Sequence, residues 1–85
     1  LNLKKALECD KNLAGANFYL GLAQLFAEKY IDALHSFKRA YELDRKYSEA
    51  LFNIAVIYEH LGDSYKAFIY YRQYLTETKE LKPKY

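Results

Sequence analysis

The sequence predicts an all-α fold made of antiparallel helix pairs, and three observations lead to this prediction. Apolar residues recur at the three- and four-residue spacing of helices along most of the chain. Glycine occurs three times and proline once, so few residues would interrupt a helix. The stretches Phe18–Asp44 and Phe52–Leu81 each show two amphipathic helical patterns joined by a short turn. Runs rich in Tyr and Ile do not alternate with polar residues, so no strand is expected.

The N-terminal part is expected to hold a short helix followed by a longer one. Residues 1–9 carry apolar and charged side chains on opposite faces, which is helical spacing. We interpret residues 10–12 as a turn, with Asn12 as the N-cap of the next helix. That helix is predicted over about residues 14–27. It is apolar on more than one side, which is typical of the inner layer of a helical array.

Two further helices are expected in the middle of the chain. A turn at residues 28–29 leads into a helix over about residues 31–43, which has one apolar face. Residues 44–47 connect it to a third helix, which begins with Ser48 as its N-cap and runs to about Leu61.

The fourth helix is bounded by end signals in the sequence. Gly62 is expected to end the third helix, because the left-handed residue that follows many helices is most easily glycine. Either Asp63 or Ser64 caps the fourth helix, which is predicted over about residues 65–80. Pro83 would stop any continuation of this helix.

The two halves of the chain repeat with a period of 34 residues. A shift by this period aligns residues of equal size, in the pairs Ala33 with Ala67, Phe18 with Phe52, and Ala16 with Ala50. Small side chains at recurring positions allow helix backbones to approach closely. We assign this structural packing role to Gly21, Ala33, Ala40, Ala55, Gly62 and Ala67.

A helix pair with this period resembles the tetratricopeptide repeat, and the resemblance extends to about Leu81. The first unit matches through Leu20, Gly21, Tyr30, Ala33, Phe37, Ala40, Leu43 and Asp44. The second unit matches through Ile54, Ala55, Tyr58, Gly62, Asp63, Ala67 and Tyr71. The resemblance implies a right-handed superhelical array, or α-solenoid, forming one domain over residues 1–85. Its expected parts are a half repeat at 1–10, full repeats at 14–47 and 48–81, and a tail at 82–85.

Some positions depart from the family pattern. The tryptophan place holds Asn17 and Leu51, and the proline place holds Arg45 and Lys79. Tyr74 stands where the family usually has alanine. A large ring there suggests that the array ends or bends at this point, or that the ring covers an exposed edge.

The resemblance implies a non-enzymatic scaffold for protein–protein interaction. In such arrays the first helix of each pair lines a concave groove. The residues expected to bind a partner there are Phe18, Leu22, Leu25, Phe26, Phe52, Val56, Glu59 and His60, with Gly15 and Glu49 beside them. The groove would be apolar at one end and polar at the other. Such a surface suits a peptide or helix of a partner protein with apolar or amphipathic character.

Other functions were weighed against this one. The apolar residues would alternatively pack on neighbouring repeats or a second copy, making the chain a structural or self-associating segment of a larger protein. Nucleic-acid binding by a related helical-pair repeat would use Tyr and Phe stacking, but the net charge of +2 argues against it. Capture of a chaperone peptide's carboxylate is rejected. Phe18 and Leu22 occupy the places of the Lys and Asn it requires, and only Asn53 fits.

The sequence contains few of the patterns that indicate catalytic, metal-binding or cofactor sites. His35 and His60 are lone histidines and Cys9 is the single cysteine, so no metal site and no internal disulfide are expected. No glycine-rich phosphate loop is present, and no cofactor is expected. No apolar run approaches the ~20 residues of a membrane span. The chain begins with Leu1 and has no signal peptide, so we expect a fragment of a longer protein. An intracellular, cytoplasmic location is compatible with the cysteine content.

Overall fold

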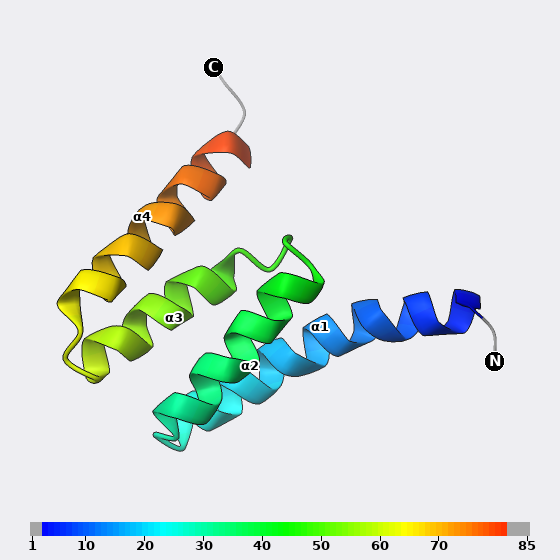
Figure 1. Cartoon of the computed structure of the whole chain (residues 1–85), viewed down its shortest axis with the longest axis horizontal. Helices are drawn as coiled ribbons and strands as arrows, with labels where there is room; N and C mark the ends of the chain where they lie inside the picture. The colour runs from blue at the N-terminus through cyan, green and yellow to red at the C-terminus, as the bar shows by residue number, and fades with distance from the viewer. Residues whose placement is uncertain (1–2, 82–85) are drawn as a thin grey trace.

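The computed structural model describes the backbone of residues 3–81 and the side chains of residues 13–78. Between residues 3 and 81 it contains four helices and no strand, which confirms the all-α class. The helices are α1 (Leu3–Phe26), α2 (Tyr30–Leu43), α3 (Glu49–His60) and α4 (Ser64–Leu81). Each helix packs on the next one in the chain, and α1 and α4 lie at opposite ends of the series (Figure 1).

The first helix is longer than the sequence predicts. It runs without a break from Leu3 to Phe26, so the turn predicted at residues 10–12 is wrong, and Asn12 is not an N-cap. The physical reason is that Asp, Lys and Asn each cost a helix interior less than about 1 kcal/mol, whereas Gly or Pro costs more. Residues 3–10 therefore form no separate half-repeat helix. The division of the chain into repeats at 14–47 and 48–81 stays a prediction.

The predicted turns after α1 and α3 are confirmed, and they have the same geometry. Glu28 and Gly62, which are one period apart, both have positive φ, at 60° and 83°. In both turns, the amide of the residue that follows donates to the carbonyl five positions back, at 2.8 Å. This is the Schellman arrangement, in which a left-handed residue satisfies the last carbonyls of a helix. Each turn reverses the chain and sends the next helix back along the previous one.

The starts of the helices are capped differently. Asp63, one of the two residues predicted to cap α4, accepts the amide of Lys66 on Oδ1 at 3.1 Å. Ser48 stands at the N-cap of α3, but its side chain makes no capping hydrogen bond and is buried. The predicted capping role of the Ser48 hydroxyl is therefore wrong. The connection before it is instead held by Asp44, whose Oδ1 accepts the amide of Lys46 at 2.9 Å.

The small residues lie where helices cross. Gly21 is buried, and a Cβ placed on it would lie 2.9 Å from two ring atoms of Phe37. The four alanines grouped with it, at positions 33, 40, 55 and 67, are at most 2% exposed. Gly62 differs, because it is exposed and a Cβ there would meet no atom within 4 Å. Its assignment to close packing is wrong, and its backbone conformation at the end of α3 is what requires glycine.

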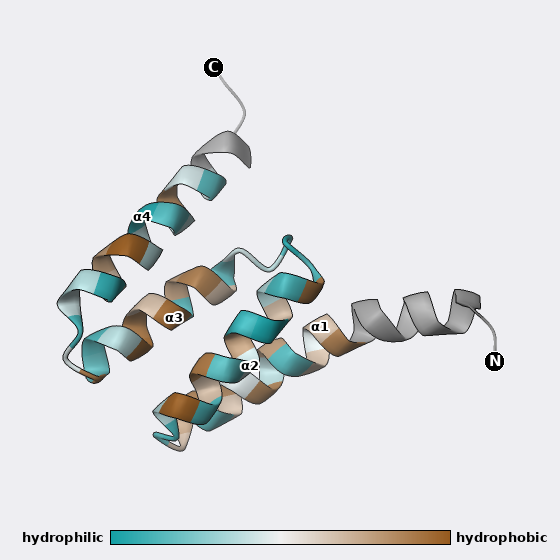
Figure 2. Ribbon diagram, viewed as in Figure 1, coloured by the Kyte–Doolittle hydropathy of each residue, from teal (hydrophilic) through white to brown (hydrophobic). Residues whose placement is uncertain are grey.

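The core forms between the paired helices. Hydrophobic and hydrophilic stretches alternate along α2 and α4, as expected for helices with one buried face (Figure 2). The largest fully buried side chains are Phe37, Leu51, Ile54 and Ile57. Because these come from α2 and α3, the middle of the series is better covered than its two ends.

Candidate functional site

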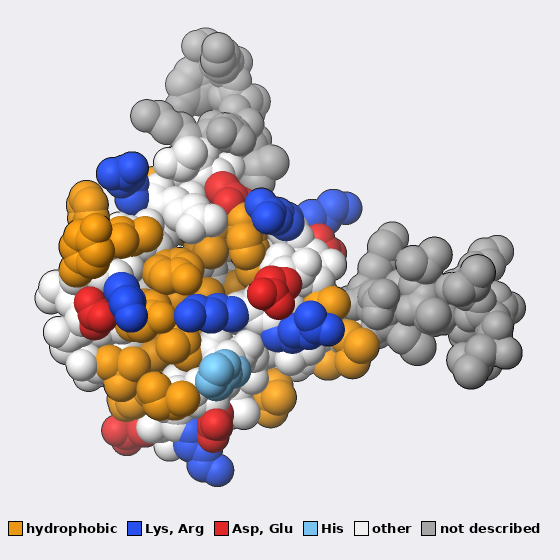
Figure 3. Space-filling model, in the orientation of Figure 1, with side chains coloured by type: hydrophobic (Ala, Val, Ile, Leu, Met, Phe, Trp, Pro, Cys, Tyr) orange, Lys and Arg blue, Asp and Glu red, His pale blue; other side chains and the backbone are white. Residues whose placement is uncertain are grey.

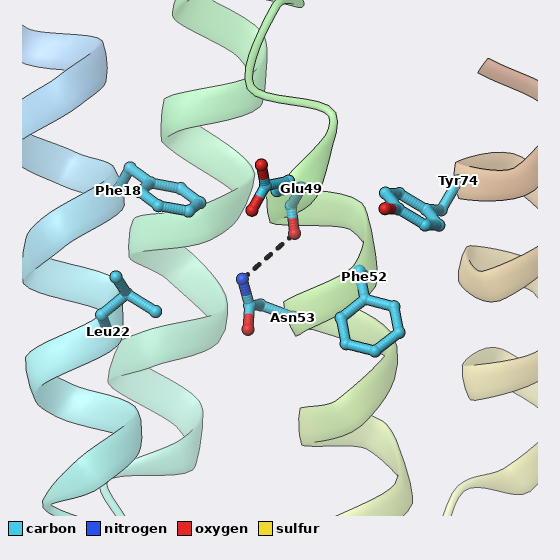
Figure 4. A pocket seen from close by; sticks show the side chains of 6 residues that line it. All are labelled: Phe18, Leu22, Glu49, Phe52, Asn53 and Tyr74. Carbon is cyan, nitrogen blue, oxygen red and sulfur yellow. Dashed lines mark hydrogen bonds between the residues drawn. The ribbon is translucent and has the colours of Figure 1, made fainter. Parts of the chain in front are cut away.

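A hollow of about 390 Å³ has walls contributed by α1, α3 and α4. It is lined by Phe18 and Leu22 from α1, by Glu49, Phe52 and Asn53 from α3, and by Tyr74 from α4. Figure 4 shows these side chains converging from three helices. The walls are mainly apolar, and the polar groups come from the first turns of α3 and from the hydroxyl of Tyr74.

Phe52 is the most accessible apolar residue of the hollow that is also held in place. Its ring lies 5.4 Å from the ring of Tyr71 in an edge arrangement and 5.4 Å from the ring of Tyr74. Aromatic pairs at this separation attract one another beyond their buried area. Phe52 nevertheless remains 43% exposed. It therefore presents a positioned ring to whatever enters the hollow.

The two side chains that α1 contributes to the hollow are packed mainly into the core. Phe18 is only 9% exposed, and its ring contacts those of Phe37 and Tyr47 at 5.6 and 5.3 Å. Phe18 thus belongs mainly to the core and offers little of its surface to the hollow. Leu22, one helical turn later, is half-buried and packs against the same core.

The polar groups of the hollow are the carboxylate of Glu49, the amide of Asn53 and the hydroxyl of Tyr74. The Nδ2 group of Asn53 donates to the backbone oxygen of Glu49 at 3.1 Å. Its amide oxygen points away from that bond (Figure 4). The side chain of Glu49 is exposed at the same edge. The hollow therefore suits a partner that brings hydrogen-bond donors or a positive charge next to an apolar side chain.

Three of the eight predicted partner-binding residues line this hollow, namely Phe18, Leu22 and Phe52. Glu49, also expected on this side, lines it as well. Asn53 was considered in the groove only for carboxylate capture, which the sequence argues against, and Tyr74 was not predicted there. Tyr74 is contributed by a second helix of a pair, and the signal for it was its ring at a position usually held by alanine.

The other five predicted residues lie elsewhere on the surface or in other contacts. Leu25 and Val56 are half-buried, and Phe26 is 82% exposed at the end of α1. The ring of His60 stacks on that of Tyr30 at 5.0 Å with an interplanar angle of 11°. This stacking joins the end of α3 to the start of α2.

Glu59 is held by α4. Its carboxylate accepts a hydrogen bond from the hydroxyl of Tyr71. Burial, together with this hydrogen bond and the charge of the carboxylate, raises the pKa of Tyr71 to about 12. Tyr41 shows the same chemistry, because burial and its hydrogen bond to Glu77 raise its pKa above the ordinary value. Both pairs connect helices, and in each the phenol loses its proton at a higher pH than an ordinary tyrosine does.

The described part of the chain also bears on metal binding and membrane insertion. No group of three or more His, Cys, Asp or Glu side chains in it is arranged to hold a metal ion. None of the helices, over the residues described, combines the length and apolar character that crossing a bilayer requires.

Part of the chain matches a known protein family. Residues 36–69 match the family model of the tetratricopeptide repeat. The matched stretch begins inside α2, contains all of α3 and ends inside α4. It has the length of one 34-residue period and crosses the boundary predicted between residues 47 and 48. No curated protein matches the chain. Residues 36–69 are thus similar to one tetratricopeptide repeat, and the four packed helices are consistent with an array of such repeats.

Proposed function

We propose that this chain is a non-enzymatic interaction module whose hollow between α1, α3 and α4 receives apolar side chains of a partner protein. Protein–protein interaction is the usual role of tetratricopeptide repeats, which are generally non-catalytic. Our proposal adds where the partner binds and what kind of segment it presents.

The positioned but accessible ring of Phe52 carries this proposal. Burying an exposed ring costs little side-chain entropy when neighbouring rings already hold it. Ligand pockets commonly span about 300–1,000 Å³, so a hollow of about 390 Å³ is near the small end of that range. It has room for one or two side chains. A longer partner segment would lie across its mouth.

The negative charge at the edge of the hollow restricts the kind of partner segment that would bind there. Glu49 provides an exposed carboxylate beside the apolar walls, and Asn53 provides an amide oxygen. A partner segment with a large apolar residue followed closely by Lys or Arg would satisfy both. A surface carboxylate contributes modestly to affinity, by up to about 1 kcal/mol, and its effect weakens with salt.

The test begins with selection from a random dodecapeptide library, using the whole chain as bait. Selected peptides are expected to combine an apolar anchor with a basic residue. Their affinity is then measured by fluorescence anisotropy for the chain and for two matched variants. Phe52→Ala removes the ring in the hollow, whereas Phe26→Ala removes an exposed ring outside it. We expect at least a tenfold loss, about 1.4 kcal/mol, for Phe52→Ala and little change for Phe26→Ala.

Two results would refute the proposal. Loss of binding in Phe26→Ala but not in Phe52→Ala would place the peptide on the wider groove expected from the sequence. Failure to select any peptide, together with tight binding of single-stranded RNA at low salt, would favour the nucleic-acid alternative. A third variant, Glu49→Gln, tests the charge. It should weaken binding of basic peptides at low salt and have little effect at high salt.

A further inference from the structure

The two end helices carry exposed stripes with the same spacing. On α1 the stripe consists of Leu13, Ala16, Leu20 and Ala23. On α4 it consists of Tyr65, Phe68, Arg72 and Leu75. All eight residues are exposed, and both stripes follow the three-four-three spacing of a single helix face. Figure 1 places the two helices at opposite ends of the molecule. On the face seen in Figure 3, hydrophobic side chains form a broad area over α3 and α4.

The repeat shows what normally covers such stripes. One period away, the α1 stripe corresponds to Tyr47, Ala50, Ile54 and Ile57, which are buried or half-buried. The contrast is large at one position, because Ile54 is 1% exposed and Leu20 is 50% exposed. Likewise, the α4 residue Phe68 is 59% exposed, whereas its equivalent Leu34 on α2 is 8% exposed. Apart from Ile31, which is 56% exposed, the equivalents on α2 and α3 are buried or half-buried, because these two helices pack on one another.

The two end stripes differ in size from their interior equivalents. On α4, the first two positions are bulkier than their equivalents on α2, with Tyr65 and Phe68 in place of isoleucine and leucine. On α1, the last position is smaller than its equivalent on α3, with Ala23 in place of isoleucine. Interfaces tolerate exchanges that conserve the total volume better than those that change it. At the first α4 position and the last α1 position the two changes offset one another, whereas Leu75 and Leu13 are both smaller than their equivalents Tyr41 and Tyr47.

The polar contact between α2 and α3 involves residues whose equivalents on α4 and α1 are also polar. Lys38 of α2 donates to the hydroxyl of Tyr58 of α3 at 3.2 Å, and its ammonium lies 5.7 Å from the centre of that ring. One period later, Arg72 provides a cation on α4. One period before Tyr58, Gln24 provides an acceptor oxygen on α1, where it already accepts a bond from Ser36. The donor and acceptor classes are therefore retained on the two uncovered faces.

We propose that copies of this chain associate head to tail, with α4 of one copy packing on α1 of a second copy as α2 packs on α3. The contact uses two different surfaces, so it is heterologous, and each dimer keeps one free α1 stripe and one free α4 stripe. Association can therefore continue beyond the dimer. The surfaces share no residue with the hollow around Phe52, so peptide binding and self-association are separable.

Sedimentation velocity of the whole chain tests this proposal. The weight-average mass is expected to rise between about 10 µM and about 1 mM without a plateau at the dimer. Leu20→Glu disables the α1 stripe, and Phe68→Glu disables the α4 stripe. Each variant alone should stay monomeric. An equimolar mixture should form dimers and no larger species, because each variant supplies the stripe that the other lacks.

Other outcomes overturn the proposal and identify what replaces it. Dimers of Leu20→Glu alone would show pairing of α4 with α4, and dimers of Phe68→Glu alone would show pairing of α1 with α1. A wild-type chain that stays monomeric at the highest concentration would leave both stripes to a different partner. Circular dichroism verifies that the helices form, and the exposed-site variants Ala23→Lys and Arg72→Glu repeat the test if either Glu variant unfolds. Phe52→Ala should associate like the wild type, which separates this result from the test of the hollow.

Discussion

Gly21 lies where α1 crosses α2. We predict that replacing glycine by alanine destabilises the chain at this position but stabilises it at Gly15, which lies in the same helix. In Gly21→Ala, the new Cβ would lie 2.9 Å from Cδ1 and Cε1 of Phe37 and 3.0 Å from Cζ. Optimal carbon–carbon contacts are about 3.5–4.0 Å, so the ring or the helix must move by about 0.6 Å. Phe37 is fully buried and lies edge-on to Phe18, which leaves the ring little room.

The expected magnitude follows from two opposing effects. Overpacking a core costs roughly 1–3 kcal/mol, whereas replacing Gly by Ala inside a helix gains about 1 kcal/mol. For Gly21→Ala the overpacking term is larger, and we expect a net destabilisation of about 1 kcal/mol. In a domain of this size, that change lowers the melting temperature by roughly 4–8 °C.

Gly15 provides the matched control. A Cβ at this position would also lie 2.9 Å from a neighbour, but that neighbour is the hydroxyl oxygen at the tip of Tyr47. Tyr47 is half-buried, and its tip can shift at little cost. The helix-propensity gain should therefore dominate, and Gly15→Ala should stabilise the chain by up to about 1 kcal/mol.

The assay is urea unfolding followed by circular dichroism at 222 nm. The slope of the unfolding free energy against urea concentration should be the same in all variants. A double variant isolates the contact. In a Phe37→Leu background the ring is absent, so Gly21→Ala should become neutral or stabilising. If Gly21→Ala stabilises the wild-type chain as much as Gly15→Ala does, the close approach of α1 and α2 does not depend on glycine and the reasoning is refuted.

Three further predictions concern the helix ends and the phenol of Tyr71. Gly62→Ala forces alanine into a positive φ and should destabilise the chain by roughly 1–2 kcal/mol, whereas Glu28→Gly should stabilise it, with thermal melting as the measurement. Equal effects in the same direction would contradict the equivalence of the two turns. Asp63→Ala removes the cap of α4 and should cost roughly 0.5–2 kcal/mol, and no loss in urea unfolding would show that the cap is dispensable. The pKa of Tyr71 is raised from 10.0 to about 12, so the unfolded chain loses this proton first, and stability should fall as the pH rises through that window. Tyr71→Phe should lose less stability over the same window, and an identical slope would show that its contact with Glu59 does not set the pKa.

Much of the fold follows from local patterns. The turns at 28–29 and 62–63 were predictable because helix-ending chemistry acts within a few residues. The turn at 10–12 was not correctly predicted, since its polar residues lower helix propensity without preventing a helix. Ser48 shows the reverse case, in which a suitable capping residue is present but its hydroxyl makes no capping bond.

The candidate site was predictable only in part. Period and family resemblance pointed to the α1 and α3 side of the molecule, and Phe52 lies there at the edge of the hollow. The burial of Phe18 depends on Tyr47, which belongs to a connection and carries no helical pattern. Tyr74 reaches the hollow from α4 because of how two helices cross, which residue spacing within one helix does not encode.

The sequence by itself determined the number of full helix pairs, their period and the small residues at their crossings, because helical periodicity and residue size are properties of the chain alone. The tertiary structure decided which apolar residues are covered. Leu34 and Phe68 occupy the same place in the repeat, yet one is buried and the other is open. Burial depends on the neighbouring helix, and only the packed arrangement places α3 against α2 while leaving the outer face of α4 uncovered.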